Sequence, residues 1–272
     1  MIPLKDQEFL RERFSRELVN SVKIDFFTQK ETSLFVPGHQ PCQYCKPTRQ
    51  MLEELAALTD AISLRQHIFD EDRKAVALYQ VDRIPAIVLH GSNALPAGRQ
   101  GRWLKYYGFP GGHEFATLIE TIVDISRGTQ YLSEQTRKRL RKLKQDVRIQ
   151  VFVTPACPYC PQMARLAYHL ALENPHVTTE VIEAGEFPEL SQRHQVRAVP
   201  TTVLSARGGP ASGGDDKVTF PGVVPDNVLM DIIDRAIHPS PLAEATLEGG
   251  PTTSTAEAKT PTGRGRGKIV VP

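Results

Sequence analysis

The stretch Thr154-Pro155-Ala156-Cys157-Pro158-Tyr159-Cys160-Pro161 holds two cysteines three positions apart. It follows an apolar run at residues 147–153, which predicts a β-strand, and it opens a segment with the apolar spacing of a helix. At a helix start, one thiol can lie at the positive end of the helix dipole, where its thiolate is stabilised. The second thiol stays close enough to close a disulfide with the first. The stretch therefore predicts a redox-active cysteine pair.

The same arrangement occurs earlier in the chain, as Pro41-Cys42-Gln43-Tyr44-Cys45-Lys46. Cys157 lies 115 positions after Cys42. Each half also has a β-like run that an apolar-proline pair opens, and Pro200 again lies 115 positions after Pro85. Two motifs that repeat at one offset indicate a tandem duplication.

Both halves predict the same order of elements, namely strand, helix, strand, short helix, two strands and helix. The first half is expected to place them at residues 22–27, 42–58, 62–69, 73–79, 86–90, 103–107 and 113–126. The second half is expected to place them at residues 147–153, 157–172, 177–183, 187–194, 201–205, 217–220 and 227–237. A strand, Cys-x-x-Cys and helix in succession are typical of a thioredoxin-type redox site. The predicted fold class is α/β, with two tandem thioredoxin-like domains, each a central mixed β-sheet flanked by helices.

The chain divides into four parts by composition. They are an N-terminal thioredoxin-like domain at 1–128, a basic linker helix at 129–146, a C-terminal thioredoxin/glutaredoxin-like domain at 147–238 and a disordered tail at 239–272. An amphipathic helix at 4–20 leads the first domain, with Asp6 as its candidate N-cap. We interpret the Lys and Arg residues of the linker as a solvated face rather than an anion site. The tail lacks the apolar content to offset its ordering entropy.

Length, net charge and cysteine content exclude several classes of function. At 272 residues the chain can form two domains of ordinary size, and its net charge of +2 is too small to imply nucleic acid or an acidic membrane as the main partner. All four cysteines belong to the two pairs, unlike those of a disulfide-stapled secreted protein. No run reaches the roughly 18 apolar residues of a membrane span, and the first residues show no signal sequence. We expect a cytoplasmic protein.

The first cysteine of each pair is the expected nucleophile, because helix amides can point only at its sulfur. Cys42 and Cys157 would attack a substrate disulfide, and Cys45 and Cys160 would resolve the mixed disulfide. The alternative is a structural zinc site, but 111 residues lie between the pairs rather than the roughly 15 to 20 of a zinc ribbon. We expect no metal, and we interpret His39 as a loop histidine.

The second site is expected to be the more reactive. Pro158 would occupy the first helical position, where its fixed φ suits the helix and its missing N–H is no loss. That would pre-organise the surroundings of the Cys157 thiol better than those of Cys42, which precedes Gln43.

Cys42-Gln43-Tyr44-Cys45 and Cys157-Pro158-Tyr159-Cys160, with Pro85 and Pro200, resemble the motifs of a known family. It comprises the glutaredoxin-like protein disulfide oxidoreductases of thermophilic archaea and bacteria, which have tandem thioredoxin folds. The resemblance covers about residues 4–238 and implies a cytoplasmic dithiol-disulfide exchange enzyme whose second site is usually the more reactive. The segments that depart from the family, and that bear on substrate choice, are the tail and the loops at 92–102 and 208–216.

Pro85 and Pro200 stand where that family has its cis-prolines, so we expect cis bonds there. A strand edge that a proline bounds can offer main-chain hydrogen bonds to an extended substrate segment. Tyr44 and Tyr159 are expected to pack and to shape the substrate groove rather than to take part in chemistry.

Asp25 interrupts an apolar strand at the place where thioredoxins carry a buried carboxylate that assists proton transfer, and its counterpart in the second half is Gln150. A buried carboxylate with a raised pKa could act as base to Cys45. An aspartate at the edge of the strand would instead be solvated. The sequence leaves both interpretations open.

The leading functional hypothesis is an enzyme that reduces, forms or isomerises protein disulfides with no cofactor beyond its cysteines. A second hypothesis is an electron carrier that a thioredoxin reductase-like flavoprotein recharges and that serves a peroxiredoxin or another reductase. A third is a peptide-binding scaffold with a vestigial site, against which the intact cysteines and prolines argue. A glutathione-dependent glutaredoxin also fits the second motif, although no glutathione-binding pattern accompanies it.

Overall fold

The computed structural model of the chain describes residues 2–30, 41–91, 103–128, 131–206 and 217–238. The elements of the first half are α1 Leu4–Glu17, β1 Val22–Thr28, α2 Cys45–Ala56, β2 Ile62–Ile68, α3 Arg73–Tyr79, β3 Ala86–Gly91, β4 Leu104–Tyr107 and α4 His113–Arg127. Then follow α5 Glu134–Leu140, β5 Val147–Val153, α6 Cys160–Glu173, β6 Val177–Glu183, α7 Pro188–Arg193, β7 Thr201–Ala206, β8 Lys217–Pro221 and α8 Asp226–Ile237. His39, the tail and the loops at 92–102 and 208–216 lie outside the described residues.

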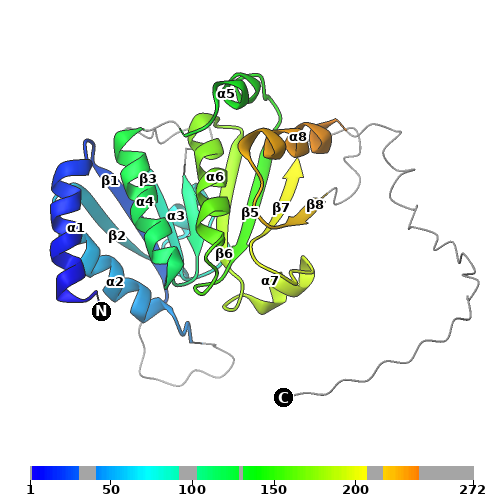
Figure 1. Cartoon of the computed structure of the whole chain (residues 1–272). Helices are drawn as coiled ribbons and strands as arrows, with labels where there is room; N and C mark the ends of the chain where they lie inside the picture. Colours follow the sequence, from blue (N-terminus) through cyan, green and yellow to red (C-terminus); the bar gives the residue numbers. More distant parts are fainter. Residues whose placement is uncertain (1, 31–40, 92–102, 129–130, 207–216, 239–272) are drawn as a thin grey trace, which may run out of the picture. The chain divides into compact units, whose positions relative to one another are not determined.

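The strands form one sheet in the order β2-β1-β3-β4-β6-β5-β7-β8 (Figure 1). In each half the first two strands are parallel and the others pair antiparallel. The halves join where β4 pairs in parallel with β6, from Leu104 opposite Thr179 to Tyr107 opposite Ile182. The sequence predicts one sheet for each domain, and the structure joins the two because the pairing leaves neither β4 nor β6 as an open edge.

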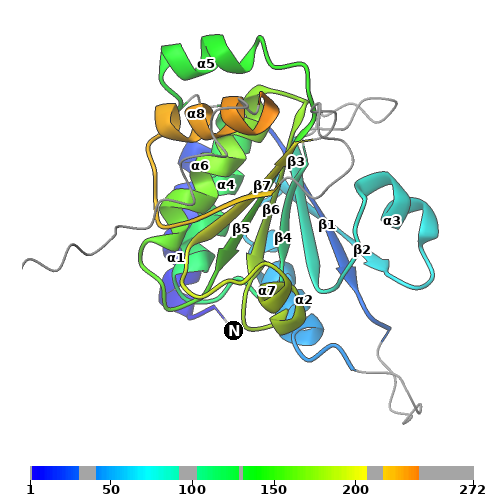
Figure 2. The ribbon, with the colours of Figure 1, turned by 90° about the vertical axis from the view of Figure 1, so that its right-hand side faces the viewer.

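Helices cover both faces of the sheet. Buried residues of α1, α2, α4, α6 and α8 form one core with alternate strand residues such as Ile24 and Phe26. The other face carries a second core, which includes Phe27 of β1 and Tyr79 of α3, and the partly buried Leu190 of α7 packs against it. Figure 2 shows α3 on the opposite side of the sheet from α4 and α6.

The helices that follow the cysteine pairs begin three residues later than the sequence predicts. α2 begins at Cys45 and α6 at Cys160, so the first cysteine of each pair lies in the turn before the helix. Tyr159 is the N-cap of α6, and Pro161 rather than Pro158 lies in its first turn. The expected place of Pro158 at the first helical position is therefore wrong.

The leading helix also differs from expectation. Pro3 rather than Asp6 occupies the N-cap of α1, and Asp6 lies within the first turn. The helix buries Leu10 and Phe14, whereas the exposed fractions of Leu4 and Phe9 are 78% and 62%. Residues four apart share one face of a helix, so the Leu10–Phe14 pair sets the face that turns to the core.

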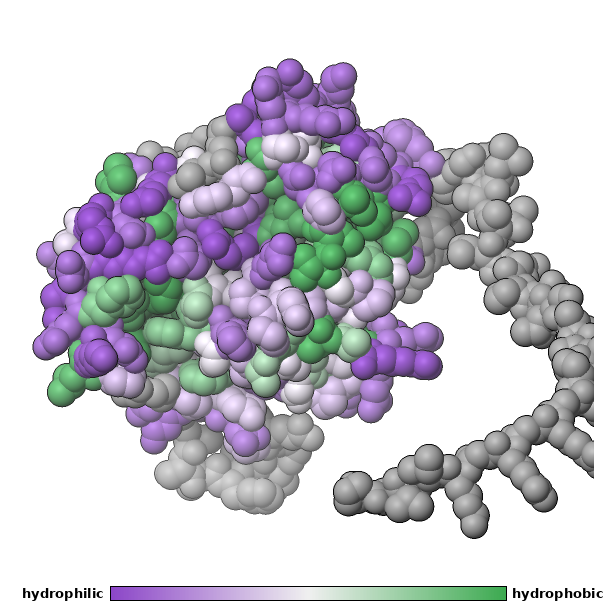
Figure 3. All heavy atoms as spheres, in the orientation of Figure 1, coloured by the Kyte–Doolittle hydropathy of each residue, from purple (hydrophilic) through white to green (hydrophobic). Residues whose placement is uncertain are grey.

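The linker contains a shorter helix than predicted, since α5 spans Glu134–Leu140. The Ser133 side chain caps it by accepting a hydrogen bond from the Thr136 N–H. Arg139 forms ion pairs with Asp231 and Asp234 of α8, at 2.7 and 2.6 Å. The surface over α5 is hydrophilic (Figure 3). Arg139 is thus paired with α8, and the solvated face that the sequence predicts for the rest of the linker stays a prediction.

Candidate functional site

The second cysteine pair lies between the end of β5 and the start of α6. Both thiols are free and buried. The main-chain N–H of Cys160 donates a hydrogen bond to the Cys157 sulfur at 3.2 Å, and that sulfur lies 3.6 Å from the carbonyl oxygen of Val199. A helix N-terminus that points an N–H at a sulfur stabilises the thiolate there. The geometry therefore fits Cys157 as the nucleophile.

Cys160 is the more deeply buried cysteine of this pair, with no exposed surface. Burial raises the pKa of the Cys160 thiol well above its ordinary value, and the Cys157 sulfur and the charge of Glu114 add to this shift. A hydrogen bond with the Thr154 backbone opposes it only in part. Cys160 therefore needs a nearby base to lose its proton before it can attack a mixed disulfide.

The first pair, Cys42 and Cys45, forms a disulfide whose Cα atoms lie 5.4 Å apart. Cys45 is buried at the start of α2, and Cys42 is half-buried in the turn before it. The side-chain oxygen of Gln29 accepts a hydrogen bond from the Cys42 N–H at 2.7 Å. As in the second pair, the first cysteine is the more exposed of the two.

The two prolines have the expected geometry, because both the Ile84–Pro85 and the Val199–Pro200 bonds are cis. Both rings are buried. The carbonyl oxygen of Pro85 accepts a hydrogen bond from the Gly108 N–H at 2.9 Å, and that of Pro200 accepts one from Gly222 at 2.7 Å. The Val199 oxygen is brought to the Cys157 sulfur, so the second proline loop borders its cysteine pair.

The two motif tyrosines lie at the surface beside the cysteines. Tyr44 is the N-cap of α2 and is 37% exposed, and Tyr159 is the N-cap of α6 and is 65% exposed. Their place allows contact with a substrate, and their role there stays a prediction.

Asp25 is buried, but it is not a candidate base. Its carboxylate accepts hydrogen bonds from His67 at 2.7 Å, His90 at 2.8 Å and the Tyr79 hydroxyl at 2.9 Å. Burial alone would raise the pKa of Asp25, but these hydrogen bonds outweigh it and lower the pKa to about 2. Tyr79 belongs to the core on the α3 face, away from the core that holds the helices of both cysteine pairs. The two interpretations that the sequence left open for Asp25, a raised pKa and a solvated position at the strand edge, are therefore both wrong.

Glu114, which the sequence does not single out, is the buried carboxyl beside the second pair. It lies on α4, has no exposed surface, and neither of its carboxyl oxygens has a hydrogen-bond partner. Burial raises the pKa of Glu114 to about 7. Glu114 stands four residues before Leu118 on the apolar stripe of its helix, and a carboxyl on that stripe is the signal that could have found it.

Residues of the first half of the chain also contact the loop that precedes the second cysteine pair. The N–H of His113, which opens α4, donates to the carbonyl oxygen of Pro155 at 3.0 Å. Gly112 has a φ of +55°, and a Cβ there would lie 2.4 Å from the same oxygen. Only glycine fits this contact, so α4 and the second cysteine pair are held in register across the two halves.

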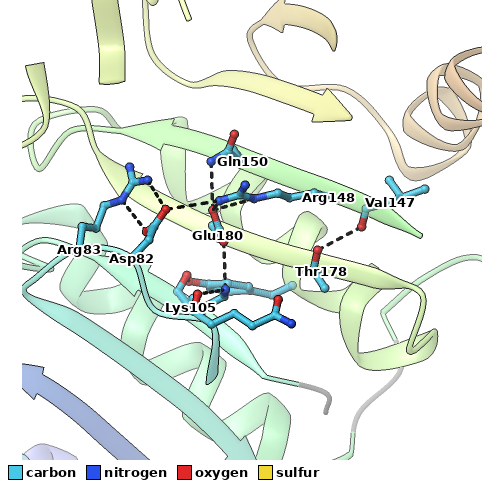
Figure 4. A network of polar contacts seen from close by, with 10 residues as sticks. Asp82, Arg83, Lys105, Val147, Arg148, Gln150, Thr178 and Glu180 are labelled. Atoms are coloured by element: carbon cyan, nitrogen blue, oxygen red, sulfur yellow. Dashed lines mark hydrogen bonds and ion pairs between the residues drawn. The ribbon is translucent and has the colours of Figure 1, made fainter. Parts of the chain in front are cut away.

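A network of charges joins the halves on the other face of the sheet (Figure 4). Glu180 of β6 pairs with Lys105 of β4 at 3.0 Å and with Arg148 of β5 at 2.6 Å. Burial alone would raise the pKa of Glu180, but the two cations outweigh it and lower the pKa. Gln150, the counterpart of Asp25, donates to Glu180 at 3.0 Å. Gln150 thus supports the seam between β4 and β6 rather than the cysteines.

Two findings on the residues that the structure describes concern metal ligands and membrane helices. Within them, no cluster of three or more His, Cys, Asp or Glu side chains is arranged to hold a metal ion. None of their helices combines the length and apolar character that crossing a bilayer requires.

Comparisons with known proteins agree with this architecture. Residues 147–233 match the family described as thioredoxin domain. Similar curated proteins include the F subunit of alkyl hydroperoxide reductase from Xanthomonas campestris pv. phaseoli, 26% identical over 155 residues, which cover 57% of this chain and 26% of that protein. The NADH dehydrogenase of Bacillus subtilis (strain 168) is 19% identical over 153 residues, which cover 56% and 29%. The chain thus matches about a quarter of the length of these relatives.

Solved structures share the fold over most of the chain. A protein disulfide oxidoreductase from Aeropyrum pernix K1 has a TM-score of 0.70 and 24% identity, and the match covers 88% of this chain and 95% of that one. The NTD_N/C domain of alkylhydroperoxide reductase AhpF from Enterococcus faecalis (V583) has a TM-score of 0.67 and 21% identity, with 85% and 99% covered. The chain has a thioredoxin-like fold, and the expected likeness to protein disulfide oxidoreductases is confirmed at the level of the fold.

Proposed function

We propose that this thioredoxin-like chain is a thiol-disulfide oxidoreductase that exchanges electrons with protein disulfides chiefly through its second cysteine pair. The observation that supports this most directly is the 3.2 Å hydrogen bond from the Cys160 N–H to the Cys157 sulfur. This hydrogen bond can stabilise a thiolate on Cys157, and the buried thiol of Cys160 belongs to the same pair. The reaction needs no cofactor beyond the cysteines.

The exchange proceeds in two steps. The Cys157 thiolate attacks one sulfur of a substrate disulfide, a mixed disulfide forms, and the other substrate sulfur leaves as a thiolate. Cys160 then loses its proton and attacks the Cys157 sulfur, which releases the second substrate sulfur. Two electrons have passed to the substrate, and the pair ends as a disulfide. The first pair can undergo the same exchange, with Cys42 as nucleophile and Cys45 as resolving thiol.

We assign Glu114 as the base that takes the proton of the Cys160 thiol. A base works best when its pKa lies near the working pH, and the pKa of Glu114 is about 7. Its charge acts on Cys160, so the carboxyl lies within electrostatic reach of the thiol that must be deprotonated. The role that the sequence offered to Asp25 in the first half thus passes to a residue that serves the second pair.

Substrate would bind along the proline loops. Next to Cys157, the main chain of Val199 before Pro200 can pair with an extended segment, and the exposed Tyr159 can cover it. Pro85 and Tyr44 are the corresponding candidates at the first pair. This arrangement favours extended polypeptide segments that carry a disulfide.

A second candidate function is electron carriage between a flavoprotein of the thioredoxin reductase type and a peroxiredoxin. The likeness to a domain of alkylhydroperoxide reductase AhpF favours it. Both functions use the same sulfur chemistry and differ in partner. We retain a cytoplasmic location in this proposal, because thiol pairs that must be re-reduced suit a reducing compartment.

The test is turnover of a protein disulfide such as that of insulin, with three electron donors in parallel. Dithiothreitol, glutathione with its reductase, and NADPH with a thioredoxin reductase each recharge a different class of dithiol protein. We expect turnover with dithiothreitol and with thioredoxin reductase. Turnover with glutathione alone would indicate a glutaredoxin, and no turnover with any donor would contradict the proposed function.

A further inference from the structure

α4 of the first half and α6 of the second half pack side by side (Figure 1). Asp124 lies on α4 and is only 2% exposed. Its carboxylate accepts hydrogen bonds from the guanidinium of Arg165, at 2.9 to 3.3 Å, and from Nε2 of His169, at 2.9 Å. Both of these donors lie on α6. The three residues, here the Asp124 cluster, therefore bind a helix of one half directly to a helix of the other.

The carboxylate of the Asp124 cluster is a buried charge that depends on its partners. Burial alone would raise the pKa of Asp124, but the hydrogen bonds from His169 and Arg165 outweigh it and lower the pKa. The Tyr131 ring stacks on that of His169, with the ring centres 4.5 Å apart, and its own centre lies 5.4 Å from the guanidinium carbon of Arg165. Both donors to Asp124 are thus held in place by an aromatic ring.

The two helices run in the same direction. At one end, the N–H of His113, the first residue of α4, donates to the Pro155 oxygen in the loop before α6. Toward the other end, Asp124 accepts a hydrogen bond from His169. Two contacts along a pair of rigid helices leave little freedom for one helix to slide past the other. The Asp124 cluster thus sets the position of α6 along α4.

The same contacts put Glu114 and Cys160 at one level. Glu114 stands ten residues before Asp124, and Cys160 stands nine residues before His169. At a rise of about 1.5 Å per residue, these helical segments are about 15 and about 14 Å long. The hydrogen bond between Asp124 and His169 therefore places the start of α4, with Glu114, beside the start of α6, with Cys160.

A buried charge pair between two helices is better suited to fix their arrangement than to add stability. Desolvation of the charges offsets much of their attraction, and the best-attested use of such groups is to specify register. An arginine that approaches a carboxylate with two nitrogens adds geometric specificity. Nε and Nη2 of Arg165 both donate to Asp124, so the contact has this geometry.

The helix of the first cysteine pair has other side chains at these positions. Gln50 and Glu54 of α2 stand 115 positions before Arg165 and His169. Glu54 accepts a hydrogen bond from the Ile2 N–H at 2.6 Å, whereas His169 donates to a carboxylate. The Asp124 cluster therefore distinguishes the second pair from the first, in line with the larger role proposed for the second pair.

We propose that Asp124 is a positioning residue of the second site. Through its cluster it holds α6 in register with α4 and so keeps the Cys160 thiol beside Glu114. The inference rests on the proposed exchange at Cys157 and adds a residue to it. During resolution the proton of Cys160 passes to Glu114, the sulfur electron pair attacks the Cys157 sulfur, and the substrate sulfur leaves as a thiolate. A misplacement of about 1 Å can slow a reaction about 10²-fold, even when its cause is far from the chemistry.

The test follows resolution of the mixed disulfide in the full-length chain with Cys42 and Cys45 replaced by serine, so that only the second pair reacts. A fluorescent thiol is attached to Cys157 as a mixed disulfide, and its release by Cys160 is recorded by stopped flow at pH values between about 5.5 and 8.5. A separate measurement follows the attack of Cys157 on a small disulfide, a step in which Glu114 takes no part.

Four variants are compared in this background. Asp124→Asn keeps the shape of the side chain and removes its charge, Glu114→Gln removes the base, and a double variant combines the two. Asp25→Asn is the control, because it also removes a buried carboxylate that accepts several hydrogen bonds, one of them from Tyr79 in the core on the α3 face. Circular dichroism and urea unfolding establish that each variant is folded.

We expect Asp124→Asn to slow release about 10 to 10²-fold at pH 7, while attack by Cys157 keeps the parent rate. The rise in the release rate near pH 7, where Glu114 loses its proton, should flatten as well. In the Glu114→Gln chain, the added Asp124→Asn should slow release little further, because register matters only when the base is present. Asp25→Asn should release the thiol at the parent rate.

Release from Asp124→Asn as fast as from Asp25→Asn, with Glu114→Gln slow, would overturn the inference and leave the proposed function standing. Effects that multiply in the double variant would also overturn it, because residues that act independently give additive free energies. Release from Glu114→Gln at the parent rate would overturn both the assignment of the base and this inference. Release from a Cys160→Ser chain at the parent rate would contradict the proposed exchange itself. Should Asp124→Asn fail to fold, Arg165→Gln, at a side chain that is 28% exposed, decides by the same criteria.

Discussion

The N–H of His113 in the first half of the chain donates a hydrogen bond of 3.0 Å to the carbonyl oxygen of Pro155, two residues before Cys157 in the second half. The loop that carries Cys157, the proposed nucleophile, is therefore held by the other half. Together with the pairing of β4 and β6, this contact makes the two thioredoxin-like halves a single working unit.

Gly112→Ala should impair the second site. The new Cβ would lie 2.4 Å from the Pro155 oxygen, so the loop before Cys157 must shift. Gly128→Ala is the matched control, because Gly128 also has a positive φ, of +61°, but nothing within 4 Å. Gly128→Ala should lose about 1 to 2 kcal/mol of stability, because Gly128 has left-handed backbone angles. Gly112→Ala should lose more, because a φ of +55° with a ψ of −127° is a conformation that glycine adopts far more readily than alanine. Only Gly112→Ala should also slow disulfide turnover, and an equal effect of the two variants on turnover would contradict the contact.

Glu114→Gln should raise stability at high pH. The pKa of Glu114 rises from 4.5 to about 7 on folding, so the folded chain holds this proton more tightly than the unfolded chain. Stability therefore falls as pH rises from about 4.5 to 7, by about 3 kcal/mol in all.

The variant removes this loss, so urea unfolding should find it about 3 kcal/mol more stable than the parent at pH 8 and equal to it at pH 4. Resolution of the mixed disulfide should become about 10² to 10⁴-fold slower. A difference in stability that does not change with pH would argue against the raised pKa of Glu114.

Asp25→Asn should destabilise the chain without changing its chemistry. The pKa of Asp25 falls from 3.8 to about 2 on folding, which contributes about 2 kcal/mol above pH 4 and is lost as pH falls through 2. Asp60→Asn, at an exposed position, is the control and should have little effect. Thermal unfolding at pH 7 and insulin reduction measure the two properties. Loss of turnover with unchanged stability would restore Asp25 as a proton acceptor.

The order of the elements could be predicted from the sequence because the repeat at 115 positions tests each assignment twice. The exact helix starts could not, because the apolar spacing that predicts α2 and α6 does not show where the turn after the first cysteine ends. Asp25 was ambiguous because Ile24, Phe26 and Phe27 are all apolar, so alternation does not tell which face the aspartate joins.

Glu114 marks the limit of sequence reasoning at the site. Cys160, on which its charge acts, is far away in the chain, and the two come within electrostatic reach only because α4 and α6 belong to different halves of one folded unit. The charge network around Glu180 has the same origin, since Lys105 and Arg148 come from different halves. Residues that act across a tertiary interface leave no local spacing to detect.

The central claim is that the second pair carries most of the turnover, because Glu114 stands beside Cys160 to take its proton. Its most direct test compares Cys157→Ser with Cys42→Ser in the reduction of insulin disulfides at pH 7, in chains of equal stability. We predict that Cys157→Ser removes most of the activity and that Cys42→Ser leaves a substantial remainder. Equal losses from the two substitutions would contradict the claim and would indicate that electrons must pass from one pair to the other.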